Sequence, residues 1–373
     1  MHAAALVEAL QRCDPMLRFY GMGGERLRKA GVRLIADAAD MAVVGLTEVC
    51  RKLPHIIKVM KQLTASWYVE KPAAIILVDY PDFNLILARR AHKRGIKVFY
   101  YISPQVWAWR RGRIGIIRRF VDKIAVILPF EESIYRSAGV DADFVGHPLL
   151  DAPLCFSSQA AAREKIGLPQ SGYTVSLLPG SRPGEVARLL PVCLEAARNI
   201  AGQNKVRFIL PLASTIARDF VERIIARHDV PVTVISHAIY EVLAASDLAI
   251  VASGTATLEA ALLETPMIVI YRVSGLSYLL GKMLIQVENI SLVNILAGKT
   301  IVPELIQDAA NPAHIAALAT GLLENPEERA RMKAALSGIK NKLGTPGAAE
   351  RAAALVVKLL ASPIKSGKDH RGR

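Results

Sequence analysis

Two loops in the second half of the chain combine small, hydroxyl-bearing and basic residues as phosphate-binding loops do. Each follows a short apolar run and leads into a predicted helix, so its backbone N–H groups lie at the positive helix end, where a diphosphate binds. Arg182 adds a guanidinium fork that matches phosphate oxygens. The first loop contains Gly180, Ser181 and Arg182, and the second contains Ser253, Gly254 and Thr255.

Glu259 lies one helical turn beyond the second loop, where its carboxylate is placed to accept a ribose hydroxyl of a bound nucleotide. Either loop taken alone is also an ordinary turn or helix N-cap. Two such loops in one half of the chain, with Arg182 and Glu259 at useful offsets, favour ligand binding over that structural interpretation. The pattern predicts a site for a nucleoside diphosphate.

The elements that must position these loops are strands and helices in alternation. Short apolar runs ending in Gly, Pro, Asp or Ser alternate with helix-period segments, which is typical of parallel sheets covered on both faces. We therefore predict an α/β fold with two Rossmann-like halves. Strands are expected near residues 18–20, 74–79, 97–102, 123–128 and 143–145, and near 173–178, 206–210, 232–236, 248–252 and 267–271.

A chain of 373 residues is too long for one ordinary core and suits two domains. We predict domains over 1–147 and 148–343, a helix over 344–361 that packs back on the first domain, and a basic tail over 362–373. The halves are expected to face each other across a cleft at the carboxyl ends of both sheets. The first predicted element is already a helix, 2–12, so the central first strand of such a domain is expected to be absent.

The composition limits the classes of binding partner that can be expected. The chain has 47 Lys and Arg against 33 Asp and Glu, and a net charge of +14 favours nucleic acid, anionic lipid or a phosphorylated substrate. No apolar run reaches membrane-spanning length and no signal peptide is evident, so we expect a cytoplasmic protein. The Cys and His residues are dispersed, and we expect neither a disulfide framework nor a structural metal.

Four motifs are spread in order over almost the whole chain. They are Val78-Asp79-Tyr80-Pro81-Asp82-Phe83-Asn84, Tyr101-Ile102-Ser103-Pro104-Gln105-Val106-Trp107-Ala108-Trp109-Arg110, Leu178-Pro179-Gly180-Ser181-Arg182 and Ala252-Ser253-Gly254-Thr255-Ala256-Thr257-Leu258-Glu259. Taken together and in this order, they resemble the motifs of lipid-A-disaccharide synthases. The string from Ser103 to Arg110 is the most specific part.

The resemblance implies a GT-B glycosyltransferase that works without a cofactor. Its substrates would be UDP-2,3-diacylglucosamine and 2,3-diacylglucosamine 1-phosphate, and nucleic acid would not be a partner. The enzyme would act at the inner face of the cytoplasmic membrane as a peripheral protein. Two departures stand out: the family's opening strand and Gly-Glu-Ala-Ser-Gly-Asp loop are missing, and Val293 stands where the family commonly has Pro.

Inverting sugar transfer needs a base for the acceptor hydroxyl and charge stabilisation for the departing diphosphate. Asp79 ends a predicted parallel strand and is the position that the family motif marks, so we expect it to be the general base for the acceptor's 6-hydroxyl. Asp82 is the competitor. It precedes a helix expected to begin near Phe83, and we interpret it as an N-cap.

The resemblance also assigns the binding residues. The two loops would hold the donor diphosphate, Glu259 the ribose, and Arg272 would be a neighbour in the UDP-sugar site. A buried aromatic pair under a basic surface explains the Trp residues almost equally well. The acceptor-binding residues would be Trp107, Trp109, Arg110 and Asn294.

An apolar lip near residue 45 is a candidate for contact with an anionic membrane surface. Val43, Val44 and Leu46 precede a predicted helix with Lys58 and Lys61, and apolar residues beside basic ones suit an interfacial protein. The segment 277–296 is rich in apolar residues, which is compatible with a homodimer, although core packing explains it equally.

Alternatives remain open at this stage. Another UDP-sugar enzyme of the same fold is one, either a peptidoglycan lipid precursor transferase or a UDP-sugar epimerase. A membrane-surface binding protein that has lost its chemistry with the missing first strand is another. The segment Gly21-Met22-Gly23-Gly24 lacks the Gly-x-Gly-x-x-Gly spacing and is predicted as a turn.

Overall fold

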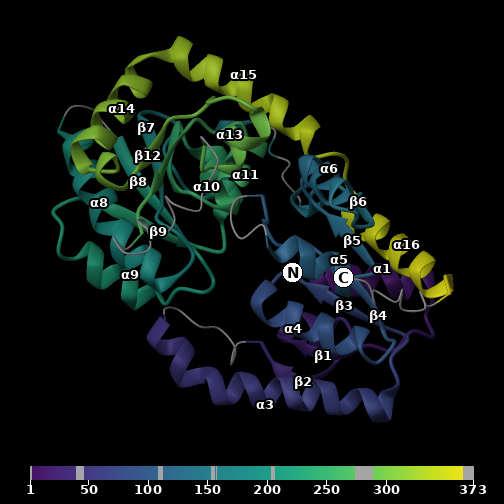
Figure 1. Ribbon diagram of the computed structural model, residues 1–373. Coiled ribbons are helices and arrows are strands. Elements are labelled where there is room, and N and C mark those ends of the chain that lie inside the picture. The colour runs from purple at the N-terminus through teal and green to yellow at the C-terminus, as the bar shows by residue number, and fades with distance from the viewer. Residues whose placement is uncertain are drawn as a thin grey trace. The chain divides into compact units, whose positions relative to one another are not determined.

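The computed structural model describes residues 2–38, 46–107, 112–152, 156, 158–202, 206–273 and 289–363, with side chains between 46 and 52 left aside. These residues form two compact units (Figure 1). Unit 1 comprises residues 1–152 and 343–373, and unit 2 comprises residues 153–342.

Unit 1 alternates strands and helices. Its elements are α1 (His2–Cys13), β1 (Tyr20–Gly23), α2 (Glu25–Lys29), β2 (Arg33–Asp37), α3 (Leu46–Glu70), β3 (Ala74–Val78), α4 (Pro81–His92), β4 (Lys97–Tyr101), α5 (Arg113–Phe120), β5 (Lys123–Val126), α6 (Pro129–Ser137), β6 (Ala142–Phe144), the 3₁₀ turn η2 (Pro148–Asp151) and α16 (Ala348–Ala361).

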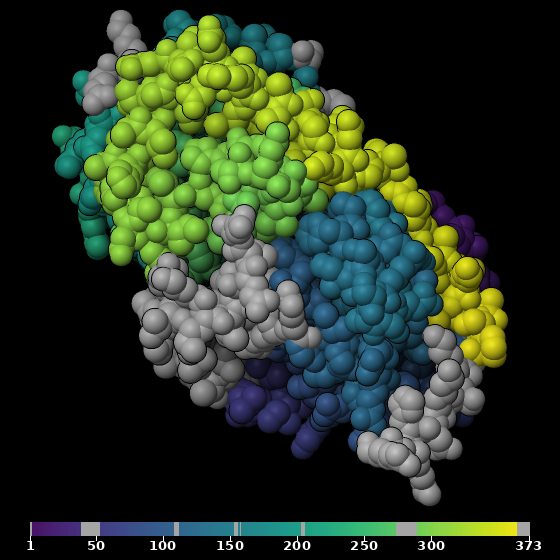
Figure 2. Space-filling view, turned by 45° about the horizontal axis from the view of Figure 1, so that its top comes forward, coloured from purple at the N-terminus to yellow at the C-terminus, as the bar shows by residue number. Residues whose placement is uncertain are grey.

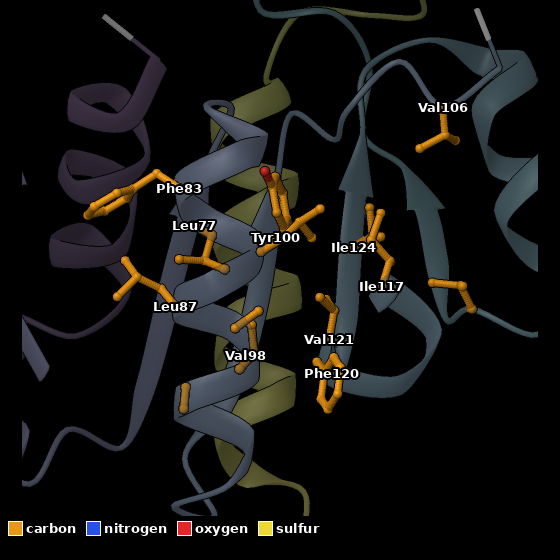
Figure 3. Packing of buried hydrophobic residues seen from close by; sticks show 14 of the residues in the cluster. Leu77, Phe83, Leu87, Val98, Tyr100, Val106, Ile117, Phe120, Val121 and Ile124 are labelled. Atoms are coloured by element: carbon orange, nitrogen blue, oxygen red, sulfur yellow. The ribbon is translucent and has the colours of Figure 1, made fainter. Parts of the chain in front are cut away.

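The strands of unit 1 lie in two parallel sheets, β3-β4-β5-β6 and β1-β2. Strand β4 is buried on both faces, and its side chains alternate between two apolar clusters. Val98 and Tyr100 lie in a cluster with side chains of α3, α4 and α5, and Figure 3 shows its members from α4 and α5. Phe99 and Tyr101 instead lie in a cluster with side chains of α1 and α16. The two faces therefore place consecutive tyrosines in different surroundings.

Helix α16 packs along α1 and over β4 within unit 1, and its yellow residues form part of the surface in Figure 2. The Lys97 ammonium donates to the carbonyls of Leu359 and Leu360, each at 2.9 Å. A cation at these last carbonyls complements the helix dipole. This contact fastens the end of α16 to the start of β4.

Unit 2 has the same alternation. Its elements are α7 (Gln159–Lys165), β7 (Tyr173–Leu178), α8 (Pro183–Ala201), β8 (Val206–Leu212), α9 (Arg218–Ile225), β9 (Val232–Ser236), α10 (Ile239–Ala245), β10 (Leu248–Ala252), α11 (Thr255–Leu262), β11 (Met267–Tyr271), α13 (Leu292–Ala297), β12 (Glu304–Ile306), the 3₁₀ turn η3 (Gln307–Ala309), α14 (Pro312–Glu324) and α15 (Pro326–Lys342).

The strands of unit 2 form one parallel sheet in the order β12-β11-β10-β7-β8-β9. Strands β10 and β11 are fully buried apart from their last residues, because helices cover both faces. The uninterrupted apolar sequences of these strands reflect that burial. The sheet order sets β7, β10 and β11 side by side, with all carboxyl ends at one edge.

Several sequence-based predictions need correction. Strands β2 and β12 were not predicted, and β1 runs over Tyr20–Gly23 rather than 18–20. The predicted turn at Gly21 to Gly24 is therefore wrong, since most of it lies in β1, where pairing with β2 overrides the weak strand preference of glycine. A Cβ at Gly23 would lie 2.3 Å from Leu27 Cδ1, so a larger residue there would displace the Leu27 side chain.

Candidate functional site

The predicted diphosphate loops meet at the carboxyl edge of the unit 2 sheet. Leu178 at the end of β7 pairs with Val251 in β10, and Ala252 pairs with Ile270 in β11. Because these strands are parallel neighbours, the loops that follow them begin side by side. The fold thus places Gly180–Arg182, Ser253–Thr255 and Arg272 at the same edge of the unit 2 sheet.

The first loop already holds a carboxylate from its own helix. Glu185 accepts from the Ser181 N–H at 3.3 Å and from Arg182 Nη1 at 3.1 Å. Gly180 has φ 118°, and a Cβ there would lie 2.7 Å from the Glu185 carboxylate, so glycine allows this close approach. The sequence analysis missed Glu185; an acid in the first helical turn, three residues after Arg182, was the available signal.

The contact between Glu185 and Arg182 is weak enough for another anion to replace Glu185. The Arg182 side chain is 73% exposed, and a surface pair at this spacing contributes only about 0.3–0.5 kcal/mol. A diphosphate carries more charge than a carboxylate and offers the same kind of oxygen. The guanidinium and the loop N–H are therefore available to an incoming anion.

The second loop exposes the start of α11. Gly254 is the N-cap residue and makes no side-chain cap hydrogen bond. The Thr257 N–H donates to the Gly254 carbonyl at 3.1 Å, so the N–H groups of Thr255 and Ala256 are the candidates for an anion. The Ser253 hydroxyl donates to the carbonyl of Ile290 at 3.1 Å. Ser253 thus fixes the loop against the segment before α13, and the backbone is the stronger candidate for the phosphate contact.

Glu259 lies on α11, half-buried, and receives a hydrogen bond from the Tyr240 hydroxyl. Burial raises the pKa of Glu259, and the hydrogen bond from Tyr240 partly offsets that rise. The same burial, with the nearby carboxylate, raises the pKa of Tyr240 to about 12. Tyr240 therefore remains a donor that orients Glu259, and nothing in the sequence pattern had pointed to it.

Arg272 and Asn294 are both held by neighbouring protein groups. Arg272 Nε donates to the carbonyl of Gln307 at 3.1 Å. Asn294 is fully buried: its oxygen accepts from the Ile301 and Val302 N–H groups, and its nitrogen donates to Val302 and Glu304. These bonds occupy the whole amide, so the arrangement gives Asn294 a structural role rather than the predicted contact with the acceptor.

The turn after β3 has an unusual backbone. Asp79 and Tyr80 have φ 49° and 45°, and neither is glycine. The left-handed region costs an ordinary residue roughly 1–2 kcal/mol, so surrounding contacts must impose this turn. Asp79 is exposed, and its turn lies beside the end of β4 because Val78 pairs with Tyr101.

Asp82 does not cap α4 as predicted. The helix begins at Pro81, its N-cap residue is Tyr80, and no side chain makes the cap hydrogen bond. Asp82 lies in the first turn and forms an ion pair with Arg113 on α5. Its carboxylate is 75% exposed, so it complements the helix dipole from the surface.

Trp107 packs against protein in the loop after β4. Its ring meets that of Phe130 edge to face, with centroids 5.0 Å apart, and its Nε1 donates to Glu131 at 3.1 Å. Burial raises the pKa of Glu131 to about 7, although the Trp107 hydrogen bond opposes the rise. Trp107 thus packs against Phe130, and the predicted pairing of the two Trp residues stays a prediction because Trp109 and Arg110 lie outside the described residues.

The predicted apolar lip lies mostly outside the described residues. This applies to Val43, Val44 and the side chain of Leu46, although Leu46 begins α3. Within the described parts of the chain, no helix is both long and apolar enough to cross a bilayer. In the same parts, no three His, Cys, Asp or Glu side chains gather as metal ligands.

Solved structures with low sequence identity share the fold. A calicheamicin glycosyltransferase, CalG4, aligns with TM-score 0.60 at 14% identity, covering 97% of this chain and 95% of that one. Staphylococcus aureus MnaA, solved with UDP, aligns with TM-score 0.64 at 14% identity, covering 96% and 92%. These alignments, with the two parallel-sheet units, confirm the predicted GT-B fold class.

Sequence comparisons give the family. A lipid-A-disaccharide synthase of Syntrophus aciditrophicus is 57% identical over 96% of this chain and 94% of its own length. One of Geobacter sulfurreducens is 44% identical over 98% and 95%. Residues 1–357 match the family described as Lipid-A-disaccharide synthetase. The chain therefore belongs to this family of glycosyltransferases.

Proposed function

We propose that the protein transfers 2,3-diacylglucosamine from its UDP donor to the 6-hydroxyl of 2,3-diacylglucosamine 1-phosphate. Family membership supports this reaction over an epimerase or a binding protein. The observation that carries the donor assignment is the convergence of Gly180–Arg182 with Ser253–Thr255 at one sheet edge. The S. aureus protein of the same fold was solved with UDP, which fits a nucleotide site.

In this proposal the named side chains have separate roles. Arg182 and the N-terminus of α11 stabilise the charge that grows on the diphosphate as it leaves. The Glu259 carboxylate, which Tyr240 orients, accepts hydrogen bonds from the ribose hydroxyls. Asp79 takes the proton of the acceptor hydroxyl, and the hydroxyl oxygen attacks the anomeric carbon of the donor sugar. The products are UDP and an acylated disaccharide 1-phosphate.

The direct test is to incubate the protein with both acylated substrates. We expect UDP release that depends on the acceptor, together with a disaccharide 1-phosphate detected by mass spectrometry. Omitting the acceptor is the control. UDP release at the same rate without acceptor would show hydrolysis of the donor, and a change in sugar configuration without UDP release would show an epimerase.

We also propose that α3 contributes to contact with an anionic membrane surface, next to the predicted lip. Leu53 and Ile57 are one turn apart and 48% and 46% exposed, while Lys58 and Lys61 are exposed beside them. The opposite face of the helix, including Val59 and Trp67, is buried in the core. An apolar stripe with adjacent cations suits an interfacial helix. A peripheral location would bring acylated substrates within reach.

The double substitution Leu53→Ser and Ile57→Ser should weaken binding to anionic vesicles about tenfold, because two apolar side chains no longer leave water. Vesicle co-sedimentation measures the change, and thermal melting should stay near that of the parent protein because both side chains are exposed. Val357→Ser on α16, which is 41% exposed, is the matched control. Equal vesicle binding by all variants would rule out this surface.

A further inference from the structure

The carbonyl of Asp79 is held from two sides by buried donors. The Tyr100 hydroxyl donates to it at 2.7 Å, and Asn84 Nδ2 donates to it at 2.6 Å. The Asp79 N–H in turn donates to the carbonyl of Tyr101 at 3.2 Å. Both lone pairs of the carbonyl are thus engaged, and the peptide unit on each side of the Asp79 Cα is fixed.

These two donors come from rigid parts of unit 1. Tyr100 is fully buried in β4, and Figure 3 shows its ring among the side chains of α4 and α5 with the hydroxyl oxygen toward the carboxyl ends of the strands. Asn84 is buried in the first turns of α4, where its amide also donates to Val78. A neighbouring strand and helix therefore impose the left-handed backbone at Asp79.

The hydroxyl of Tyr100 is a permanent donor. Burial raises its pKa far above the usual value, and the charge of Asp79 raises it further. The hydroxyl therefore stays protonated and remains a donor at neutral pH. The contact also places the Tyr100 hydroxyl close enough to Asp79 for an electrostatic interaction with its carboxylate.

The backbone conformation at Asp79 decides where the carboxylate points. A change from the left-handed to an ordinary region would redirect the Cα–Cβ bond, and a displacement of about 1 Å at a reacting group can lower a rate by about 100-fold. We propose that Tyr100 and Asn84 are positioning residues that hold Asp79 in this left-handed turn and so direct its carboxylate. The inference rests on the proposed function, because it requires Asp79 to be the base.

The sequence offers a closely matched control. Tyr101 is the next residue of β4, is equally buried, and faces α1 and α16 instead. Within the described residues, its hydroxyl has no hydrogen-bond partner. Tyr100→Phe and Tyr101→Phe thus remove the same atom from adjacent sites, and only the first change removes a donor from the Asp79 carbonyl.

The experiment compares kcat and KM of Tyr100→Phe, Tyr101→Phe, Asn84→Ala and Asp79→Asn, alone and with Tyr100→Phe added to Asp79→Asn. We expect Tyr100→Phe to lower kcat about tenfold with an unchanged KM for the UDP donor, and Asn84→Ala to act in the same direction. Tyr101→Phe should behave like the parent. Adding Tyr100→Phe to Asp79→Asn should cause no further loss, since Tyr100 acts through Asp79. Thermal melting confirms that each variant is folded.

Separate outcomes identify which idea fails. If Asp79→Asn is inactive while Tyr100→Phe keeps full kcat, the positioning role is wrong and the proposed base stands. The positioning role is also wrong if Tyr100→Phe lowers activity equally with and without Asp79. If Asp79→Asn keeps its activity, the base assignment falls and the positioning role falls with it.

Discussion

Replacing Asp79 with Asn should lower kcat about 1,000-fold, because general base catalysis contributes roughly 10²–10⁴ in rate. Asn keeps the size of the side chain and the backbone contacts to Tyr100 and Asn84, so the loss comes from the missing basic oxygen. The affinity for UDP should change less than about twofold, since the donor loops belong to unit 2. Acceptor-dependent UDP release and calorimetric titration with UDP measure the two quantities.

Asp82→Asn is the matched control for this substitution. It removes the same charge three residues away, and the amide oxygen can still accept from Arg113, the partner of Asp82. We expect it to keep activity within about threefold, because a surface ion pair contributes little. If Asp82→Asn were the inactive variant and Asp79→Asn the active one, the base would be Asp82.

The sheets were predictable where burial is complete. Strands β10 and β11 were predicted with their observed ends, because parallel strands covered on both faces read as unbroken apolar runs. Strands β2 and β12 were missed for the opposite reason. Both lack fully buried residues, and each pairs at the margin of a sheet, where the sequence carries polar residues such as Arg33 and Glu304.

The two loops at Gly180–Arg182 and Ser253–Thr255 were predictable from the sequence because local composition determines them, and their role in donor binding stays a prediction. Their convergence followed from a general rule, since the carboxyl ends of neighbouring parallel strands share one edge. The contacts that orient the side chains were not predictable. Tyr240 and Glu259 are far apart in the chain, and so are Tyr100 and Asp79, so each pairing appears only when helices and strands take their places.

Asn294 illustrates the limit of a motif. A polar residue in a motif shared with an enzyme family reads equally well as a substrate ligand or as a structural link. Burial and hydrogen bonding separate the two: the amide of Asn294 is consumed by Ile301, Val302 and Glu304. The sequence motif does not show that these hydrogen bonds are made within the protein, because the partners come from the turn and strand that follow α13.

Replacing Arg182 with Ala should lower kcat/KM about 100-fold, since removing one preorganised donor from a developing anion costs about 10²–10³ in rate. The affinity for UDP should fall in the same variant, because the guanidinium binds the diphosphate in the ground state as well. Arg182→Lys keeps the charge but loses the two-pronged geometry, and we expect an intermediate loss of about tenfold. Steady-state kinetics and calorimetric titration with UDP measure both effects.

Arg198→Ala is the matched control, because Arg198 is exposed on the same helix, α8, and its loss changes the net charge equally. We expect its kcat/KM and its UDP affinity to equal those of the parent protein. If Arg198→Ala weakened UDP binding as much as Arg182→Ala, the effect would be one of overall charge. If only Arg182→Ala loses UDP affinity, and if added UDP inhibits the parent enzyme more strongly than added salt does, the results would instead identify a built diphosphate site. In that site the Glu185 carboxylate, which pairs with Arg182 at 3.1 Å, would be replaced by the diphosphate.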